Sequence, residues 1–464
     1  MDEIFSLSII ELAKFYRLKE ISPLEFLKAT LERAKEKNAE LNAFISFWEE
    51  ESLGLALKSE QIFLKNESAH ILEGIPFSVK DLFYTKDKLT TCGSRILKNF
   101  IPDFTAAAVE KLTDAGAILF GKTNMLEFAY GIVHEDFGKC NNPWDITKTS
   151  GGSSSGSAAS IAANIGCFSL GTDTGGSIRI PSSYCGIVGL KPTYNLISTN
   201  GVFPLSKSLD HVGPITRTVE DLKLVFDAMT AKNSCFYHEY PFTCQSDSVS
   251  SDSVQFKRIG ILPDSFMNGI NIEVKNCYEQ SLEVMRNIGF DIIPIQLPNI
   301  DNVLEILIKI LLPEASYIHM KWLNRSEDYA PLTFLQIQNG LHIPAVDYIK
   351  ANDEMFTFRN HVNRIFDDYQ LSAIVTPTVP FPAPDEDPGI EDGDINEALF
   401  TGLFNVSGHP AITVNGGFTM DGLPIGIQFV GQWLGETELL HISQIFETYS
   451  SVSFKRKLGN KDEK

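Results

Sequence analysis

The sequence is poor in basic residues. Its 464 residues include 39 lysines and arginines against 59 aspartates and glutamates, which gives a formal net charge of −20 at pH 7. Nucleic acids and anionic membranes attract proteins through patches of positive charge. We therefore expect a cytoplasmic protein that binds neither nucleic acid nor a membrane directly.

Long apolar runs and paired cysteines are also missing. The most apolar stretch, VLEILIKILL, is interrupted by Glu305 and Lys309 well short of a membrane span. The acidic start, MDEIFSLSII, has no basic region followed by an apolar core, so we expect no signal peptide. The seven cysteines are odd in number and form no C-x-x-C pair, which favours reduced thiols over a disulfide framework or a zinc site.

Alternating strand and helix patterns favour an α/β fold. Residues 1–65 are mainly helical in pattern, whereas GIPFSVKD at 74–81 alternates apolar and polar residues as a strand does. AAAVEKLTDAG at 106–116 predicts a short amphipathic helix, and AILFGKT after it predicts a strand. Similar alternation continues after residue 257. The sequence thus predicts a large mixed, mostly parallel twisted sheet with helices covering both faces.

Two short motif matches disagree with their context. GAILFGKT at 116–123 fits the phosphate-binding pattern G-x-x-x-x-G-K-T, but its four middle residues belong to a predicted strand that follows a helix. GSSSG at 152–156 fits the elbow G-x-S-x-G with Ser154 as nucleophile, but no apolar strand precedes it. We therefore favour neither nucleotide binding nor a hydrolase built on that elbow.

A glycine-rich segment places a serine directly after two glycines. In SLGTDTGGSIR, the loop from Thr174 to Ser177 can turn so that consecutive backbone N–H groups converge, because glycine carries no side chain to block an approaching oxygen. Convergent N–H donors of this kind form an oxyanion hole. Taken alone, the loop is also compatible with a simple turn that carries a capping serine.

Two further segments favour chemistry at Ser177. TSGGSSSGSAA is a second cluster of glycine and serine, in which Ser153 precedes Ser177 by 24 residues. The predicted helix and strand between the two clusters can bring the chain back beside its start. Lys80 ends an apolar strand pattern, and burial there would lower the pKa of its amine and leave it able to accept a proton.

Together these segments resemble the amidase signature family. The resemblance is carried by GIPFSVKD, GKTNMLEFAYG, NNPWD, SGGSSSGSAA, SLGTDTGGSIRIPSSYCGIVGLKPT and SLDHVGPITRTVED, and it continues more thinly through FNVSGHPAITV and GLPIGIQFVG. It implies one domain over 1–464. This domain has N-terminal helices at 1–65, the signature core at 70–225, a polar linker or loop at 244–256, and a C-terminal part at 257–464 that completes the sheet and pocket.

The resemblance also implies a Ser-Ser-Lys triad and no metal or organic cofactor. Ser177 corresponds to the nucleophile, Ser153 to the bridging serine that a cis peptide holds in the family, and Lys80 to the base. The other implied site residues are Thr174, Gly175, Gly176 and Ser177 for the oxyanion hole, Asp173 and Arg179 as supporting residues, and Ala129, Tyr130 and Gly131 for substrate binding. Ser155 stands where relatives usually have glycine, a change that could tighten the turn or narrow the pocket.

The implied activity is hydrolysis of a carboxylic amide to an acid and ammonia or an amine through an acyl-Ser177 intermediate. The C-terminal half resembles stand-alone amidases more than the A subunit of the tRNA-dependent amidotransferase, which releases ammonia from glutamine for partner subunits. We therefore expect a stand-alone amidase with a small-molecule amide substrate, and a homodimer is compatible with that role. The amidotransferase subunit is the alternative, and an inactive binding member of the family is a third hypothesis.

Overall fold

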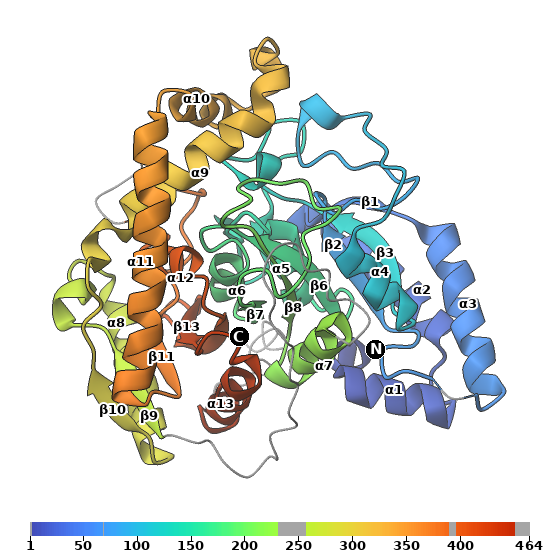
Figure 1. Ribbon diagram of the computed structural model, residues 1–464. Helices are drawn as coiled ribbons and strands as arrows, with labels where there is room; N and C mark the ends of the chain where they lie inside the picture. Colours follow the sequence, from blue (N-terminus) through green and yellow to red (C-terminus); the bar gives the residue numbers. More distant parts are fainter. Residues whose placement is uncertain (1, 68, 231–256, 389–395, 451–464) are drawn as a thin grey trace.

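The computed structural model describes residues 2–67, 69–230, 257–388 and 396–450 (Figure 1). The predicted linker at 244–256 lies outside these residues. The helices are α1 (Ile9–Leu18), α2 (Pro23–Leu41), α3 (Glu49–Leu64), α4 (Ala107–Asp114), α5 (Ser155–Ala162), α6 (Arg179–Cys185), α7 (Val219–Thr230), α8 (Ile272–Asn287), α9 (Val303–His319), α10 (Pro331–Gly340), α11 (Ala345–Tyr369), α12 (Thr401–Ser407) and α13 (Glu436–Tyr449). The strands are β1 (Phe44–Phe47), β2 (Pro76–Lys80), β3 (Ile118–Thr123), β4 (Asn141–Asn142), β5 (Asp145–Thr149), β6 (Phe168–Asp173), β7 (Val188–Lys191), β8 (His211–Thr216), β9 (Arg258–Ile261), β10 (Asp291–Pro294), β11 (Ala373–Pro377), β12 (Ala411–Phe418) and β13 (Pro424–Val430).

One sheet of eleven strands runs through the molecule in the order β1-β3-β2-β6-β8-β7-β12-β13-β11-β9-β10. The predicted mixed sheet is confirmed, but the prediction that it is mostly parallel is wrong. Only β2 with β3 and β6, and β9 with β10 and β11, pair in parallel; the other six of the ten neighbouring pairs are antiparallel. The reason is local in part: only a few residues join β12 to β13, and so short a connection permits antiparallel pairing alone.

Helices cover both faces of the sheet, as predicted. Successive side chains of a strand point to opposite faces. In β3, Ile118 and Phe120 pack in one buried cluster with residues of α2 and α5. Leu119, between them, packs in a second cluster with residues of α4 and α7. Each face of β3 is therefore buried under a pair of helices.

Local sequence signals set several element boundaries. Ser22 caps α2 and forms the full capping box with Glu25, as S-x-x-E predicts. The 106–116 pattern forms α4, and Gly116 follows it at φ 85°, a conformation that glycine adopts without strain. β3 then occupies the middle of the phosphate-binding match, so no phosphate loop forms there. Residues 1–65 are mainly helical, as predicted, and also contribute the short strand β1, which pairs with β3.

The apolar stretch at 303–312 lies in α9, which packs against α10 and α11. Across the part of the chain that the structure describes, no helix is both long enough and apolar enough to cross a membrane.

Candidate active site

The sheet brings Lys80 and the glycine-rich loop to the same edge. β2 and β6 are parallel neighbours, so their carboxyl ends lie side by side. Lys80 is the last residue of β2, and β6 ends at Asp173, directly before the loop that carries Ser177. Ser153 precedes α5, a helix whose small residues allow close packing against β2, β3 and β6.

The Lys80 amine is fully buried and contacts two hydroxyl groups. Its Nζ lies 2.7 Å from Ser153 Oγ and 3.0 Å from Thr172 Oγ1. Burial lowers the pKa of Lys80 from 10.5 to about 7, although the carboxylates of Asp173 and Asp210 oppose this shift. A substantial fraction of Lys80 is therefore neutral near pH 7, and a neutral amine at this distance can accept the proton of Ser153.

The backbone around Ser153 lies against the loop that carries Ser177. The Gly152–Ser153 peptide bond is cis. The N–H of Ser154 donates to the carbonyl oxygen of Ser177 at 3.2 Å, so the two serine-containing loops are joined. Ser153 is 2% exposed, whereas Ser177 is only partly buried. Of the two serines in the predicted triad, Ser177 is thus the one that a substrate can reach more easily.

The loop from Gly175 to Ser177 offers unused backbone donors. Within the described part of the chain, the N–H groups of Gly175, Gly176 and Ser177 have no acceptor. Gly176 has φ +145°, and a Cβ on it would lie 2.4 Å from Thr401 Oγ1, so a side chain does not fit. The Thr401 hydroxyl donates to the carbonyl oxygen of Gly175 at 2.7 Å, which helps to fix the peptide orientation. These are the features of an oxyanion hole.

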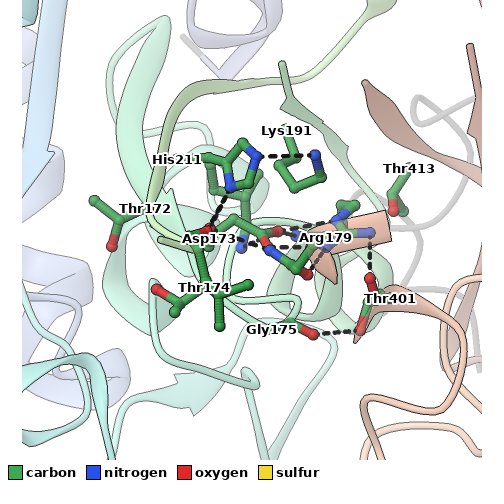
Figure 2. A network of polar contacts seen from close by, with 12 residues as sticks. Thr172, Asp173, Thr174, Gly175, Arg179, Lys191, His211, Thr401 and Thr413 are labelled. Carbon is green, nitrogen blue, oxygen red and sulfur yellow. Dashed lines mark hydrogen bonds and ion pairs between the residues drawn. The ribbon is translucent and has the colours of Figure 1, made fainter. Parts of the chain in front are cut away.

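A buried ion pair supports this loop from behind (Figure 2). Arg179 donates to both oxygens of Asp173, with Nε–Oδ2 at 2.9 Å and Nη2–Oδ1 at 2.8 Å. Burial alone would raise the pKa of Asp173, but Arg179 outweighs it and holds this pKa well below its usual range. Asp173 Oδ2 also accepts from the N–H of Ile178, at 3.1 Å. The pair therefore fastens the two ends of the loop to each other.

Arg179 also connects the loop to the C-terminal part of the chain. Its remaining donors reach the carbonyl oxygen of Thr401 at 3.0 Å, Gln428 Oε1 at 2.6 Å and Asn405 Oδ1 at 2.6 Å. Figure 2 shows Thr401 beside Arg179, on the side away from His211 and Lys191. The Arg179 side chain is thus the centre of a network that spans both halves of the sheet.

Arg179→Met should lower the free energy of unfolding by about 3–5 kcal/mol, because it leaves the carboxylate of Asp173 buried without its cation. Amide hydrolysis should fall with it, since the loop loses its support. Chemical denaturation measures the first effect and a turnover assay the second. Arg286→Met is the matched control: Arg286 pairs with Glu283 at the surface, at 3.1 Å, and its loss should change stability little.

His211 has a structural role here. Its Nδ1 donates to the carbonyl oxygen of Leu209 at 2.6 Å, and its Nε2 lies 3.3 Å from Lys191 Nζ. Burial lowers the pKa of His211 well below its usual range and keeps the ring neutral. Lys191 is itself held by the carbonyl oxygen of His409 at 2.6 Å. The contacts of His211 are thus those of a structural residue.

The predicted substrate-binding residues follow a segment that contacts the triad. The N–H of Leu126 donates to the carbonyl oxygen of Ser153 at 3.4 Å. Ala129 and Tyr130 are 7% and 2% exposed, and a Cβ on Gly131 would lie 2.4 Å from Thr333 Oγ1 of α10. Gly131 thus lies against α10, and the contact of all three residues with substrate stays a prediction.

Several residues of the site had no role predicted from the sequence. Thr172 contacts the amine of Lys80, whereas Thr401 and Asn405 hold the loop although they follow it by more than 200 residues in the sequence. Ser155 begins α5 and is 3% exposed, and its hydroxyl finds no hydrogen-bond partner among the residues described. Neither of its predicted effects, a tighter turn or a narrower pocket, is tested by this geometry. The described residues also hold no cluster of three or more potential metal ligands.

Known proteins of similar sequence and structure support one family. The family model described as Amidase matches residues 25–440. The A subunit of glutamyl-tRNA(Gln) amidotransferase from Geobacter sp. (strain M21) is 35% identical, over 98% of this chain and 99% of the relative. Its counterpart from Thermoanaerobacter pseudethanolicus is 33% identical, over 98% of each.

Among solved structures, a crystal structure of an amidase superposes with a TM-score of 0.84 at 30% identity, over 95% of this chain and 99% of that one. The A subunit of the amidotransferase from Thermotoga maritima superposes with a TM-score of 0.78 at 29% identity, over 96% and 95%. These similarities do not support the expectation that the chain is nearer to stand-alone amidases than to the amidotransferase. They do show that the chain belongs to the amidase signature family, whose members are enzymes that act on amide C–N bonds.

Proposed function

We propose that this chain hydrolyses a carboxylic amide through an acyl-Ser177 intermediate. The observation that carries the proposal is the contact of 2.7 Å between the buried amine of Lys80 and Ser153 Oγ. The next residue, Ser154, is hydrogen-bonded through its N–H to the carbonyl oxygen of Ser177. A buried amine with a lowered pKa is the base that an otherwise weak serine nucleophile requires.

In the proposed reaction, Ser177 Oγ attacks the amide carbonyl and passes its proton to Ser153, which passes its own proton to Lys80. The N–H groups of Gly175 to Ser177 hold the negative oxygen of the tetrahedral intermediate. Ser153 then returns a proton to the leaving nitrogen, the C–N bond breaks, and ammonia or an amine departs. Water, deprotonated by the same relay, attacks the acyl-Ser177 ester and releases the acid.

A second candidate is favoured by the sequence relatives. Curated relatives that match nearly the whole chain at 33–35% identity are A subunits of glutamyl-tRNA(Gln) amidotransferase. In that role, the chain would release ammonia from glutamine by the same acyl-serine chemistry and pass it to partner subunits that bind the tRNA. This support is stronger than any for a stand-alone amidase.

We also propose that residues 1–464 form one domain, because strands before and after 231–256 share one sheet.

A turnover screen separates the candidates. The purified chain is offered primary amides, aryl amides and free glutamine, and released ammonia or amine is measured. Turnover of simple amides by the chain alone supports a stand-alone amidase; glutaminase activity that appears only with co-purified partner subunits supports the amidotransferase role. No turnover in either format, together with no labelling of Ser177 by a fluorophosphonate probe, would contradict the proposal and favour an inactive binding protein.

A further inference from the structure

We propose that Asp210 is a positioning residue for the reaction at Ser177: it holds the oxyanion loop through the hydroxyl of Thr174. The inference rests on the proposed function. It adds an anchor for the loop besides the Asp173–Arg179 pair: Asp210 stands in the segment SLDHVGPITRTVED, but the family resemblance assigned it no role.

The carboxylate of Asp210 joins two loops. It is 8% exposed and lies directly before β8. Its Oδ1 accepts from Thr174 Oγ1 at 2.6 Å. Its Oδ2 accepts from the N–H of Leu205 at 2.9 Å, and the N–H of Ser206 lies 3.1 Å from both oxygens. Asp210 thus ties the first residue of the predicted oxyanion loop to the turn at 205–210.

That turn is itself anchored to α9. The N–H of Asp210 donates to the carbonyl oxygen of Ser206 at 2.8 Å, which closes the turn. Glu314 of α9 accepts from Ser206 Oγ at 2.6 Å and from the N–H of Ser208 at 3.0 Å. The position of Thr174 is therefore determined by α9 as well as by the sheet. Because Thr174 precedes Gly175 directly in the chain, a shift of Thr174 would move the N–H of Gly175 away from a developing oxyanion.

Asp210 also contributes to the electrostatics of the base. Its negative charge raises the pKa of Lys80, against the dominant lowering by burial. Burial raises the pKa of Asp210 itself to about 6, so this carboxyl is mostly ionised at pH 7. Other titratable groups around this pair are Asp173 of β6, Cys92, Tyr194, and Glu314 on α9. Removal of the Asp210 charge should therefore leave Lys80 neutral down to a lower pH.

Two variants separate the two effects. Asp210→Asn and Thr174→Val, alone and combined, are assayed for kcat and KM between about pH 5 and pH 9 with the best amide found. We expect each single variant to lower kcat about 10- to 100-fold with KM changed less than about threefold, because both disturb the placement of oxyanion donors. Only Asp210→Asn should move the acid limb of the pH profile to lower pH. The double variant should lose little more than the more severe single variant, since both changes weaken the same contact between Thr174 and residue 210.

Asp221→Asn is the matched control. Asp221 is also a buried aspartate, but it lies on α7 and accepts from the N–H of Ile9 at 2.8 Å. This variant should lower the melting temperature without moving the acid limb. An acid limb unchanged in Asp210→Asn, or strictly additive losses in the double variant, would reduce Asp210 to a structural residue and overturn the inference. If Asp210→Asn fails to fold, the inference is tested with Thr174→Val alone, and a kcat equal to that of the wild type would overturn it. If the wild type itself shows no turnover, the proposed function is contradicted instead.

Discussion

Ser177→Ala should lower amide hydrolysis by about 10⁴-fold or more while the protein stays folded. Without the Ser177 hydroxyl no acyl-enzyme can form, and the remaining groups polarise the substrate but cannot attack it. Folding should persist because Ser177 is only partly buried and the substitution leaves its backbone carbonyl free to accept from Ser154. Turnover, melting temperature and the mass of the acylated protein are the three measurements.

Ser154→Ala is the control for that experiment, because the elbow motif G-x-S-x-G names Ser154 as the nucleophile. In the structure, Ser154 Oγ donates to the carbonyl oxygen of Thr172 at 3.2 Å and accepts from the N–H of that residue at 3.3 Å. It is fully buried and serves the connection between α5 and β6. In the Ser154→Ala variant, Ser177 should therefore still be acylated. Acylation that persists in Ser177→Ala and disappears in Ser154→Ala would reverse the assignment.

The central part of the site could be predicted because its signals are local. Lys80 stands at the end of a short apolar strand, and such a position buries a side chain at the edge of a sheet. The glycines at 175 and 176 indicate a backbone that other atoms approach closely. In the structure, the hydroxyl of Thr401 lies where a side chain on Gly176 would be. Periodicity likewise predicted α4 and β3, since each depends on residues close together in the sequence.

The supports of the loop could not be predicted, because they are contacts between distant segments. Arg179 is hydrogen-bonded to three residues that follow it by more than 220 positions: Thr401, Asn405 and Gln428. No sequence pattern indicates that any of them contacts Arg179. Strand direction failed for a related reason. The same alternation of strands and helices is compatible with neighbouring strands that are parallel and with neighbouring strands that are antiparallel, as β7 and β8 are.

Substrate choice depends on the parts of the site that are least determined by motifs. A Cβ on Gly175 would meet only Leu307 of α9, at 4.0 Å, and Gly131 lies against Thr333 of α10. The helices α9 and α10 therefore approach the site from the C-terminal part of the chain, which holds few of the motifs that carry the resemblance in the sequence. This is why the triad can be assigned to both a stand-alone amidase and an amidotransferase.

Lys80→Met should lower amide hydrolysis about as severely as loss of the nucleophile and remove the acid limb of the pH profile. In the wild type, kcat/KM should rise with pH through about 7, because burial lowers the pKa of Lys80 to that value and only the neutral amine accepts the proton of Ser153. Any residual activity of Lys80→Met should lack this rise. Steady-state kinetics across the pH range measures both effects.

The stability of Lys80→Met distinguishes a catalytic base from a structural lysine. The folded-state pKa of Lys80, about 7, lies below the 10.5 of an exposed lysine. Between these values the unfolded chain binds a proton that the folded chain does not, so the burial of Lys80 costs stability, fully below pH 7 and less as the pH rises toward 10.5. Lys80→Met should therefore melt no lower than the wild type at pH 7, although it is inactive.

Lys122→Met is the comparison for that result. Lys122 is also fully buried, on the neighbouring strand β3, but its Nζ lies 3.5 Å from Asp81 Oδ1 and not against the serines. Its removal leaves Asp81 buried without a cation and should lower the melting temperature, while the acid limb near pH 7 remains. A Lys80→Met protein that melts far below the wild type and keeps the acid limb, as expected here for Lys122→Met, would show that Lys80 is a structural lysine and that another group is the base.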